Sequence, residues 1–389
     1  MRFAIVRQDY HPDGAVERAI EPALEALLER NVAVSLYTRA WPQMRLQLIE
    51  PVICNPFHIG KGWRERSFAI AACRSIRRSL PSLVEAHAPM LCCDIYRAGD
   101  GVHADRLEQR LKHASAAERL RIACSPYHRY RLRIEERLFA SGWLRKVICK
   151  STMVRDEIHA RFAVPESKLA VIFNPVDGER FHPGLRADRP KVLERYRVDA
   201  SATVFIAVCR DFEHDGAATL IDAIAELPPP AHLVVVAAPR CARRVRARAR
   251  ARGIDARVTT VDSHVDVRPH YGAADVFVAP SRYDPSPDAP LEAMACALPV
   301  IASTKSGVAE LLAEHECGLV CPPRDAGALA AHMRSLLDGS MRARLGDNAR
   351  RAVLPLSPAA TTLSLVLLYR DLLASGAPRV ARNATTIGA

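Results

Sequence analysis

The sequence predicts an α/β protein with two doubly wound, Rossmann-like domains that face each other across a cleft. Short apolar, strand-like segments alternate with segments of helical spacing, which is the pattern of parallel sheets covered by helices. The alternation stops at residues 174–183, where proline and glycine cluster, and then starts again. A length of 389 residues also suits two domains of ordinary size, each with its own core.

The domain boundaries follow from this break. We expect a first domain at residues 1–175, a second at 176–358, an amphipathic helix at 359–375 and a loose tail at 376–389. In the first domain, the expected strands are 3–6, 32–37, 91–96 and 147–148, and the expected helices are 16–28, 67–80, 104–122 and 128–140. In the second domain, the expected strands are 204–208, 232–237, 258–260, 276–278 and 299–302, and the expected helices are 217–226, 268–274 and 291–297.

The chain is strongly basic, with a formal net charge of +12. Residues 106–137 hold nine Lys or Arg with tyrosines between them, and residues 240–257 hold eight arginines and a single acid. Such surfaces attract phosphorylated lipids, membrane headgroups or nucleic acid. A solvated helix face explains 240–257 equally, and we favour it there. No recognition motif accompanies the charge, so nucleic acid is not expected as a partner.

The eleven cysteines include no paired C-x2-C units. Cys317 and Cys321 are four residues apart but lack the second pair that a zinc site needs. We therefore expect reduced, mostly buried thiols and no metal site.

Most of the predicted chemistry lies in residues 281–310. Asp284 and Glu292 are eight residues apart, the first in a proline-rich loop and the second in the helix that follows, so both can reach one site. The turn at 303–307 opens another helix, where backbone N–H groups bind phosphate well. Carboxylates for sugar hydroxyls beside a cradle for a diphosphate are typical of a nucleotide-sugar site.

This block resembles the acid-x7-acid motif of the retaining family-4 glycosyltransferases, which have the GT-B fold. The usual first acid is Glu, and here it is Asp284. Three further stretches extend the resemblance over nearly the whole chain: the opening segment 2–41, the segments YRAGDGVHADRLEQR and SPYHRYRLRIEERLF, which are similar to lipopolysaccharide-core sugar transferases, and the linker VIFNPVDGERFHP. The resemblance implies that helix 359–375 returns to the first domain.

The resemblance also implies roles for residues of the second domain. Glu292 would accept the ribose hydroxyls of the nucleotide, and Asp284, at a catalytic position, would hold hydroxyls of the transferred sugar. The diphosphate would bind Lys305 and the backbone N–H groups of Ser306, Gly307 and Val308. A solvated Glu, a turn-forming Asp and a plain helix cap are the alternatives.

In the first domain, the resemblance places Asp100 and His103 at catalytic positions near the sugar and the attacking hydroxyl, which either could orient. A turn Asp with an exposed His is the alternative. Residues Asp13, Gly14 and Ala15 match the loop where the family has Gly-Gly, and they would approach phosphate or acceptor. An ordinary strand-to-helix turn explains them nearly as well.

One segment departs from the family. CRDFEHDGAATLIDAIAEL has His214 and Asp215 where the family carries an Arg-Lys pair that clamps the donor diphosphate. An acid in place of a lysine repels phosphate, by roughly 4 kcal/mol for unit charges ~4 Å apart at an effective dielectric of 20. Arg210, Lys305 or a protonated His214 could supply the missing cation.

Taken together, these residues favour a retaining hexosyltransferase. It would use a nucleoside-diphosphate sugar, with UDP favoured and neither cofactor nor metal required, and a saccharide or glycolipid acceptor, as in lipopolysaccharide core or related surface-glycan synthesis. The alternatives are a non-catalytic relative that binds nucleotide, glycan or a partner enzyme, and a basic protein of nucleic acid or membrane surfaces. We expect a cytoplasmic protein, attached peripherally to the anionic inner face of the cytoplasmic membrane.

Overall fold

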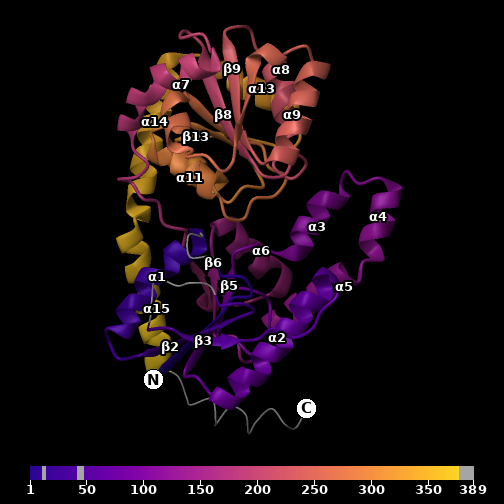
Figure 1. Cartoon of the computed structure of the whole chain (residues 1–389), viewed down its shortest axis with the longest axis vertical. Coiled ribbons are helices and arrows are strands. Elements are labelled where there is room, and N and C mark those ends of the chain that lie inside the picture. Colours follow the sequence, from indigo (N-terminus) through magenta and orange to yellow (C-terminus); the bar gives the residue numbers. More distant parts are fainter. Residues whose placement is uncertain (11–14, 42–47, 376–389) are drawn as a thin grey trace. The chain divides into compact units, whose positions relative to one another are not determined.

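The chain forms two compact units in the computed structural model, which describes residues 1–10, 15–41 and 48–375 (Figure 1). The first unit comprises residues 1–174 together with the segment that begins at Pro358, and the second comprises residues 175–357. Each unit is built around one parallel sheet, as the alternating sequence pattern predicts.

The first unit has a seven-stranded sheet in the order β3-β2-β1-β4-β5-β6-β7. Every strand pair in it is parallel. Its strands are β1 (Arg2–Val6), β2 (Ala33–Thr38), β3 (Glu50–Ile53), β4 (Leu83–Ala86), β5 (Ile95–Ala98), β6 (Lys146–Cys149) and β7 (Leu169–Val171). Its helices are α1 (Ala15–Leu28), α2 (Gly60–Ser79), α3 (His103–Leu111), α4 (Ala116–Ala123), α5 (Pro126–Phe139), α6 (Thr152–Phe162) and α15 (Pro358–Ala374).

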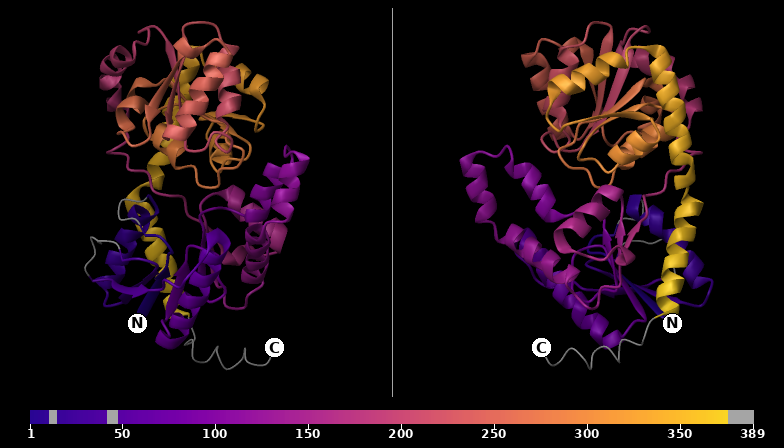
Figure 2. Two further views of the ribbon diagram at one scale, coloured as in Figure 1. Left: turned by 45° about the vertical axis from the view of Figure 1, so that its right-hand side comes forward. Right: turned by 180° about the vertical axis from the view of Figure 1, so that it is seen from behind.

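Alternate residues of these strands enter two separate cores, because successive side chains point to opposite faces of a sheet. In β1, Ala4 and Val6 pack with α2, α5 and α6, whereas Phe3 and Ile5 pack with α1 and α15. The C-terminal helix is therefore part of the first unit: it lies beside α1 and fills the second core (Figure 2). The returning helix is confirmed.

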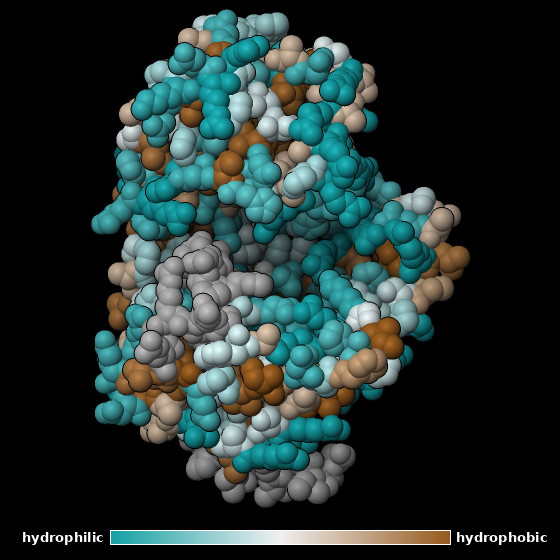
Figure 3. Space-filling model, viewed as in Figure 1, coloured by the Kyte–Doolittle hydropathy of each residue, from teal (hydrophilic) through white to brown (hydrophobic). Residues whose placement is uncertain are grey.

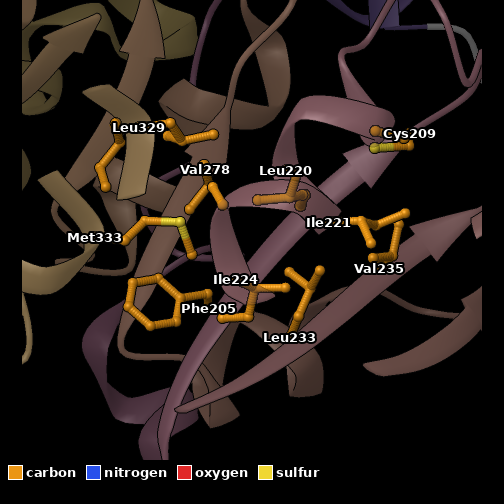
Figure 4. Packing of buried hydrophobic residues seen from close by; sticks show 14 of the residues in the cluster. Phe205, Cys209, Leu220, Ile221, Ile224, Leu233, Val235, Val278, Leu329 and Met333 are labelled. Atoms are coloured by element: carbon orange, nitrogen blue, oxygen red, sulfur yellow. The ribbon is translucent and has the colours of Figure 1, made fainter. Parts of the chain in front are cut away.

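The second unit has a six-stranded parallel sheet in the order β10-β9-β8-β11-β12-β13. Its strands are β8 (Thr203–Cys209), β9 (Ala231–Ala237), β10 (Val258–Asp262), β11 (Val276–Ala279), β12 (Val300–Ser303) and β13 (Gly318–Cys321). Its helices are α7 (Arg189–Tyr196), α8 (Ala217–Ala225), α9 (Pro239–Ala251), α10 (Arg268–Ala273), α11 (Asp288–Ala295), α12 (Ala309–Glu314), α13 (Ala326–Ser335) and α14 (Gly339–Val353). Apolar side chains from β8, β9 and β11 meet those of α8 and α13 in one core (Figure 4).

The sequence expectation lacks four strands (β3, β4, β7 and β13) and the helices α6, α7, α13 and α14, and one expected helix is broken. The short strands β3 and β4 were not predicted, because β3 is mostly exposed and β4 contains a charged residue, Glu85. The single helix expected at 104–122 is two helices, and Ser115 begins the second by accepting a hydrogen bond from the N–H of Glu118. Ser125 and Pro126 begin α5 in the same way.

The cysteines also differ from the expectation of reduced thiols. Cys73 on α2 and Cys92 in the β4–β5 connection form a disulfide with a Cα–Cα distance of 5.7 Å. The spacing of these two residues gives no hint of the pairing, because the tertiary fold alone brings them together. Of the remaining nine, all in the described chain, only Cys124 is exposed.

One helical run among the described residues, Gly339–Ala374, is long and apolar enough, by length and composition, to cross a bilayer. Its last part is α15, whose Leu365, Val366, Tyr369 and Leu372 are buried in the core beside α1. Packing within the first unit therefore accounts for part of its apolar character.

Candidate functional site

The candidate site of the second unit lies at the carboxyl ends of β8 and β11. The chain order of the strands reverses between these two neighbours, and ligands of doubly wound sheets bind outside such a switch point. Two loops meet there: residues 210–216 after β8 and residues 280–287 after β11. The backbone N–H of Arg282 donates to the carbonyl of His214 at 2.8 Å, which joins them.

Gly216 makes this approach possible. It has a left-handed φ of +76°, and a Cβ there would lie 2.2 Å from the carbonyl oxygen of Pro280. Any other residue would push the two loops apart.

Asp284 also joins the β11–α11 loop to the loop after β12. It forms a parallel bridge with Ser306: the N–H of Asp284 donates to the carbonyl of Lys305 at 2.8 Å, and the N–H of Gly307 donates to the carbonyl of Asp284 at 2.7 Å. The three loops therefore form one connected edge. Asp284 lies at its centre.

The carboxyl of Asp284 is unusually basic. Its pKa is raised to about 6: burial raises it most, the carboxylates of Asp288 and Asp215 also raise it, and Arg210 opposes them. Arg210, Asp215 and Asp288 are thus close enough to Asp284 to act on its charge. A carboxyl with a perturbed pKa at a switch point is typical of a functional site.

Glu292 lies on α11, one helix turn beyond Asp288, and is partly buried. Its Oε2 accepts a hydrogen bond at 3.2 Å from the hydroxyl of Tyr271, a residue of α10 that is 1% exposed. Burial, followed by the charge of Glu292, raises the pKa of the Tyr271 hydroxyl well above its ordinary value, so it stays a donor. Tyr271 therefore fixes the orientation of the carboxylate, a role that the sequence did not reveal.

The turn at 303–307 differs from the predicted diphosphate cradle. The N–H of Ser306 donates to the carbonyl of Ser303 at 3.0 Å, and the N–H of Gly307 is taken by Asp284. Two of the three predicted donors are thus engaged, Ser306 within its own turn and Gly307 with the β11–α11 loop, and the third residue, Val308, precedes the short α12. Lys305 is partly exposed on this turn, and the Ser306 hydroxyl is buried without a hydrogen-bond partner among the described residues.

Asp215 does not project as a free anion, contrary to the expectation of simple repulsion. Its Oδ2 accepts from the N–H groups of Arg210 at 2.6 Å and Asp211 at 2.9 Å, and its Oδ1 lies 3.0 Å from Nδ1 of His214. Burial raises the pKa of Asp215, but these hydrogen bonds outweigh it and hold the pKa below its usual value. His214 is therefore paired within its own loop.

A group of arginines at the same edge was missed by the sequence analysis. One carboxylate, Glu213, binds the guanidinium groups of Arg282 and Arg244, the latter at 2.6 Å. Arg324, after β13, is close enough to Arg282 for its pKa to be lowered by that charge as well as by burial. Arg324 also has a left-handed φ of 68°, which is unusual for arginine. The carboxyl edge of the second sheet therefore carries arginines at other positions, although the Arg-Lys pair of the family is absent.

In the first unit, Asp100 lies in an exposed turn at the carboxyl end of β5. The adjacent Gly99 faces Lys150, which follows β6 and is 4% exposed; a Cβ at Gly99 would lie 3.3 Å from its Cε. Lys150 is a candidate that the sequence analysis overlooked, because a lysine ending a strand usually reads as a surface residue.

His103 is buried in the first unit. It is 1% exposed, and both ring nitrogens are engaged: Nδ1 faces Nη2 of Arg106 at 2.9 Å, and Nε2 faces Nδ1 of His128 at 3.0 Å. Burial, and the charge of Arg106 next, lower the pKa of His103 to about 3. Because arginine only donates, Nδ1 must accept and Nε2 must carry the proton. These contacts give His103 a structural role between α3 and α5, and its catalytic role stays a prediction.

The predicted loop of the first domain is described only in part. Asp13 and Gly14 lie outside the described residues, and Ala15 begins α1. Within the described residues no cluster of three or more His, Cys, Asp or Glu could hold a metal ion.

Comparisons with known proteins agree with this architecture. The family model "Glycosyltransferase Family 4" matches residues 16–180, and "Glycosyl transferases group 1" matches residues 202–339. A probable transglycosylase of Burkholderia thailandensis is 26% identical over 351 residues, covering 87% of this chain and 88% of that protein.

Two solved structures show the same fold. WaaG, a glycosyltransferase involved in lipopolysaccharide biosynthesis, has a TM-score of 0.76 at 20% identity and covers 93% of this chain and 99% of its own. Anabaena Alr3699/HepE, in complex with UDP and glucose, has a TM-score of 0.70 at 18% identity and covers 96% and 100%.

Two parallel Rossmann-like units with a returning C-terminal helix define a GT-B protein. With both halves matched by glycosyltransferase models, the chain belongs to the family-4 glycosyltransferases.

Proposed function

We propose that this enzyme transfers a hexose, with retention of configuration, from a UDP-sugar to a saccharide or glycolipid acceptor of a bacterial surface glycan. The observation that carries the proposal is the pair of carboxylates, Asp284 and Glu292, placed by one loop and one helix at the switch point of the second sheet. Carboxylates accept hydrogen bonds from vicinal hydroxyls, which sugars and ribose both supply.

The two carboxylates are suited to different tasks. Glu292 is held by Tyr271 and can accept the ribose hydroxyls, in line with its role in the resembled family. Asp284, whose pKa is raised to about 6, is partly protonated near neutral pH and can both accept from and donate to a sugar hydroxyl. No reaction step is assigned to His103.

Cations must offset the charge of the departing diphosphate. Arg210 acts on Asp284 electrostatically and follows β8, so it belongs to the same edge. Arg282 and Arg324 add charge nearby, and Lys305 lies on the neighbouring turn. These cations support the proposal that the site binds the donor diphosphate without the Arg-Lys pair that the family usually carries.

The proposals of a UDP-sugar donor and of a lipopolysaccharide-type acceptor rest on similarity to other glycosyltransferases. The structure of the Anabaena protein holds UDP and glucose, and WaaG is involved in lipopolysaccharide biosynthesis. We also propose that the acceptor is lipid-linked and is met at the inner face of the cytoplasmic membrane.

A panel of nucleoside-diphosphate sugars tests this function. We expect a UDP-hexose to raise the melting temperature at millimolar concentration and to be hydrolysed slowly without acceptor, with release of the sugar in its original anomeric form. Failure of every nucleotide and nucleotide sugar to bind would remove the proposal.

The pairing of Asp215 where a lysine is expected favours a second candidate, a non-catalytic relative that binds nucleotide or glycan. The same panel separates the two: binding of UDP with no hydrolysis, and no transfer to lipopolysaccharide-core acceptors, would favour the second.

A further inference from the structure

A pocket with a volume of about 430 Å³ lies in the first unit, at the amino-terminal edge of its sheet. The ends of α2 and α5, the turn that leads into β6 and the β4–β5 connection enclose it. Parallel strands place substrate loops at the opposite, carboxyl-terminal edge. This pocket is therefore separate from the positions of Asp100 and Lys150.

The lining combines apolar surface with two cations. Ile76, Leu80, Leu91 and Trp143 supply the apolar part, and Arg77 and Arg137 supply the charge. Both arginines are exposed, and neither forms an ion pair with any described residue. The volume falls in the range of ordinary ligand pockets, which runs from roughly 300 to 1,000 Å³. An apolar slot beside two unpaired guanidinium groups is suited to an amphiphile with an anionic head.

A second observation indicates where such an amphiphile would come from. Exposed residues follow one line along α2 toward the pocket, at helical spacing, with two apolar side chains among three arginines: Trp63, Arg66, Ile70, Arg74 and Arg77. The only acid of α2, Glu65, lies off this line and faces Arg131 of α5. This line of residues is called the α2 stripe below.

Apolar surface continues beyond the start of α2. Phe57 and Ile59 are 76% and 69% exposed, and the ring of Phe57 packs edge-on against that of Trp63 at 6.5 Å between centroids. Hydrophobic side chains stand among hydrophilic ones over the part of the first unit where α2 and α5 lie (Figure 3). Exposed aromatic and aliphatic side chains interleaved with arginine are typical of helices that lie in the headgroup region of anionic membranes.

We propose that the α2 stripe contacts an anionic bilayer and that the pocket at its end takes one anionic phospholipid, with the phosphate between Arg77 and Arg137 and an acyl chain along Leu80, Leu91 and Trp143. The proposal is independent of the sugar-transfer function, because none of these residues belongs to the candidate site. It names a ligand and a place for the membrane attachment that the basic charge suggests.

Quenching by brominated acyl chains tests the pocket. The chain has three tryptophans, Trp41, Trp63 and Trp143, so the W41F/W63F variant reports from the pocket alone. We expect vesicles of phosphatidylglycerol and phosphatidylcholine with bromine on the chain to quench Trp143 fluorescence, and pure phosphatidylcholine to leave it unchanged. Bound protein whose Trp143 is not quenched would overturn the pocket.

Cosedimentation tests the cations with a matched control. R77Q/R137Q should bind phosphatidylglycerol vesicles about tenfold or more weakly than the wild type. R243Q/R250Q removes the same charge from exposed positions on α9, where no large apolar residue is exposed, and should bind as the wild type does. If both variants lost the same amount of vesicle affinity, net charge alone would explain the binding, and the proposal would be overturned.

Soluble ligands separate a lipid from a free anion. Short-chain phosphatidylglycerol below its micelle concentration should bind the wild type and shift the Trp143 spectrum, whereas inorganic phosphate at the same concentration should not. Equal binding of both would show a phosphate site instead, and the lipid assignment would fall. Melting temperatures of all variants, expected to stay within a few degrees because the changed residues are exposed, establish that they are folded.

Discussion

The two units use charged residues in different ways. In the first unit, Glu85 of β4 is fully buried and is bound by Arg97 of β5 at 2.7 Å and by the Tyr369 hydroxyl of α15 at 2.6 Å. Arg97 also donates to Tyr369 at 3.2 Å. In the second unit, Asp284 and Glu292 lie at the carboxyl edge of the sheet, and both are only partly buried.

The difference separates fold from function. The Glu85 network attaches the last helix of the chain to the middle of the first sheet, across a sequence separation of 284 residues. Nearby His87 stays neutral, because burial lowers its pKa to about 4. Asp284 and Glu292 lie in a loop and a helix at the edge of the second sheet, and both are only partly buried. We therefore expect stability to depend on the first group and donor binding on the second.

Breaking the buried network is the largest expected effect. Glu85→Ala leaves the Arg97 guanidinium buried without its carboxylate, which costs roughly 3–5 kcal/mol for a buried pair. The free energy of unfolding of the first unit, measured with urea, should fall by that amount. Glu118→Ala breaks an exposed pair with Arg110 on the same unit and should cost less than about 1 kcal/mol.

The network also has a pH dependence of known sign. Arg97 and His87 outweigh the burial that opposes them, and they hold the pKa of Glu85 far below its ordinary value. The stabilisation is thus fully present above the unfolded pKa of about 4.5, and it is lost progressively as pH falls from there through the lower folded value. Glu85→Ala should therefore cost less stability at pH 3 than at pH 7, because at pH 3 the Glu85 carboxyl is protonated in the unfolded wild type but still ionised in the folded protein. An equal cost at the two pH values would contradict the lowered pKa.

Residues that act together are predictable from sequence when they are neighbours in the chain. Asp284, Glu292 and Lys305 fall within a few dozen residues, so their spacing alone places them on adjoining loops. Strands and helices follow from periodicity for the same reason, whereas the return of the last helix to the first unit was implied by the family resemblance. The Glu85–Arg97–Tyr369 network, by contrast, joins three distant segments, and no local pattern records it.

Hydrogen-bond direction is equally invisible in a sequence. A serine and a glycine before a helix suggest free N–H donors, yet Ser306 donates within its own turn and Gly307 donates to the carbonyl of Asp284 in a second loop. His103 follows a strand and suggests an exposed acid-base group, but α5 covers it. In both cases the packing of a second element decides the role, and sequence pattern describes only one element at a time.

Replacing Glu292 should weaken donor binding and leave stability nearly unchanged, which is the reverse of the effect expected for Glu85→Ala. Glu292→Gln keeps the shape but loses a charged acceptor for two hydroxyls, and such hydrogen bonds contribute roughly 1.5–3 kcal/mol. UDP-sugar affinity, measured by calorimetry, should fall about 10- to 100-fold with little change in melting temperature. Glu310→Gln, on the exposed face of α12, is the matched control and should bind normally. A large loss of stability with normal affinity would contradict the division between the two units.

Asp284 differs from Glu85 in the sign of its effect, because the ionised carboxylate of Asp284 lowers the stability of the folded protein. Its pKa is near 3.8 in an unfolded chain and about 6 in the folded protein, so its ionisation reduces stability as pH rises between these values. Asp284→Asn should unfold like the wild type at pH 3.5. At pH 7 it should be more stable by about 1–2 kcal/mol, less than the full shift implies because the side chain is partly exposed. Urea unfolding at both values measures the difference, and its sign reverses if the carboxylate stabilises the fold.

The smallest effect concerns backbone strain at the same edge. Arg324 and Arg197 both have left-handed φ values, 68° and 55°, and both side chains are exposed. Glycine relieves this strain, and after the greater entropy of an unfolded glycine is subtracted, each replacement should add about 0.5 kcal/mol to stability. Only Arg324 lies near Arg282, so Arg324→Gly should also weaken UDP-sugar binding a few-fold, while Arg197→Gly should not. Equal affinities would mean that the strained arginine adds no charge to the donor site, and that Arg210 and Lys305 hold the diphosphate alone.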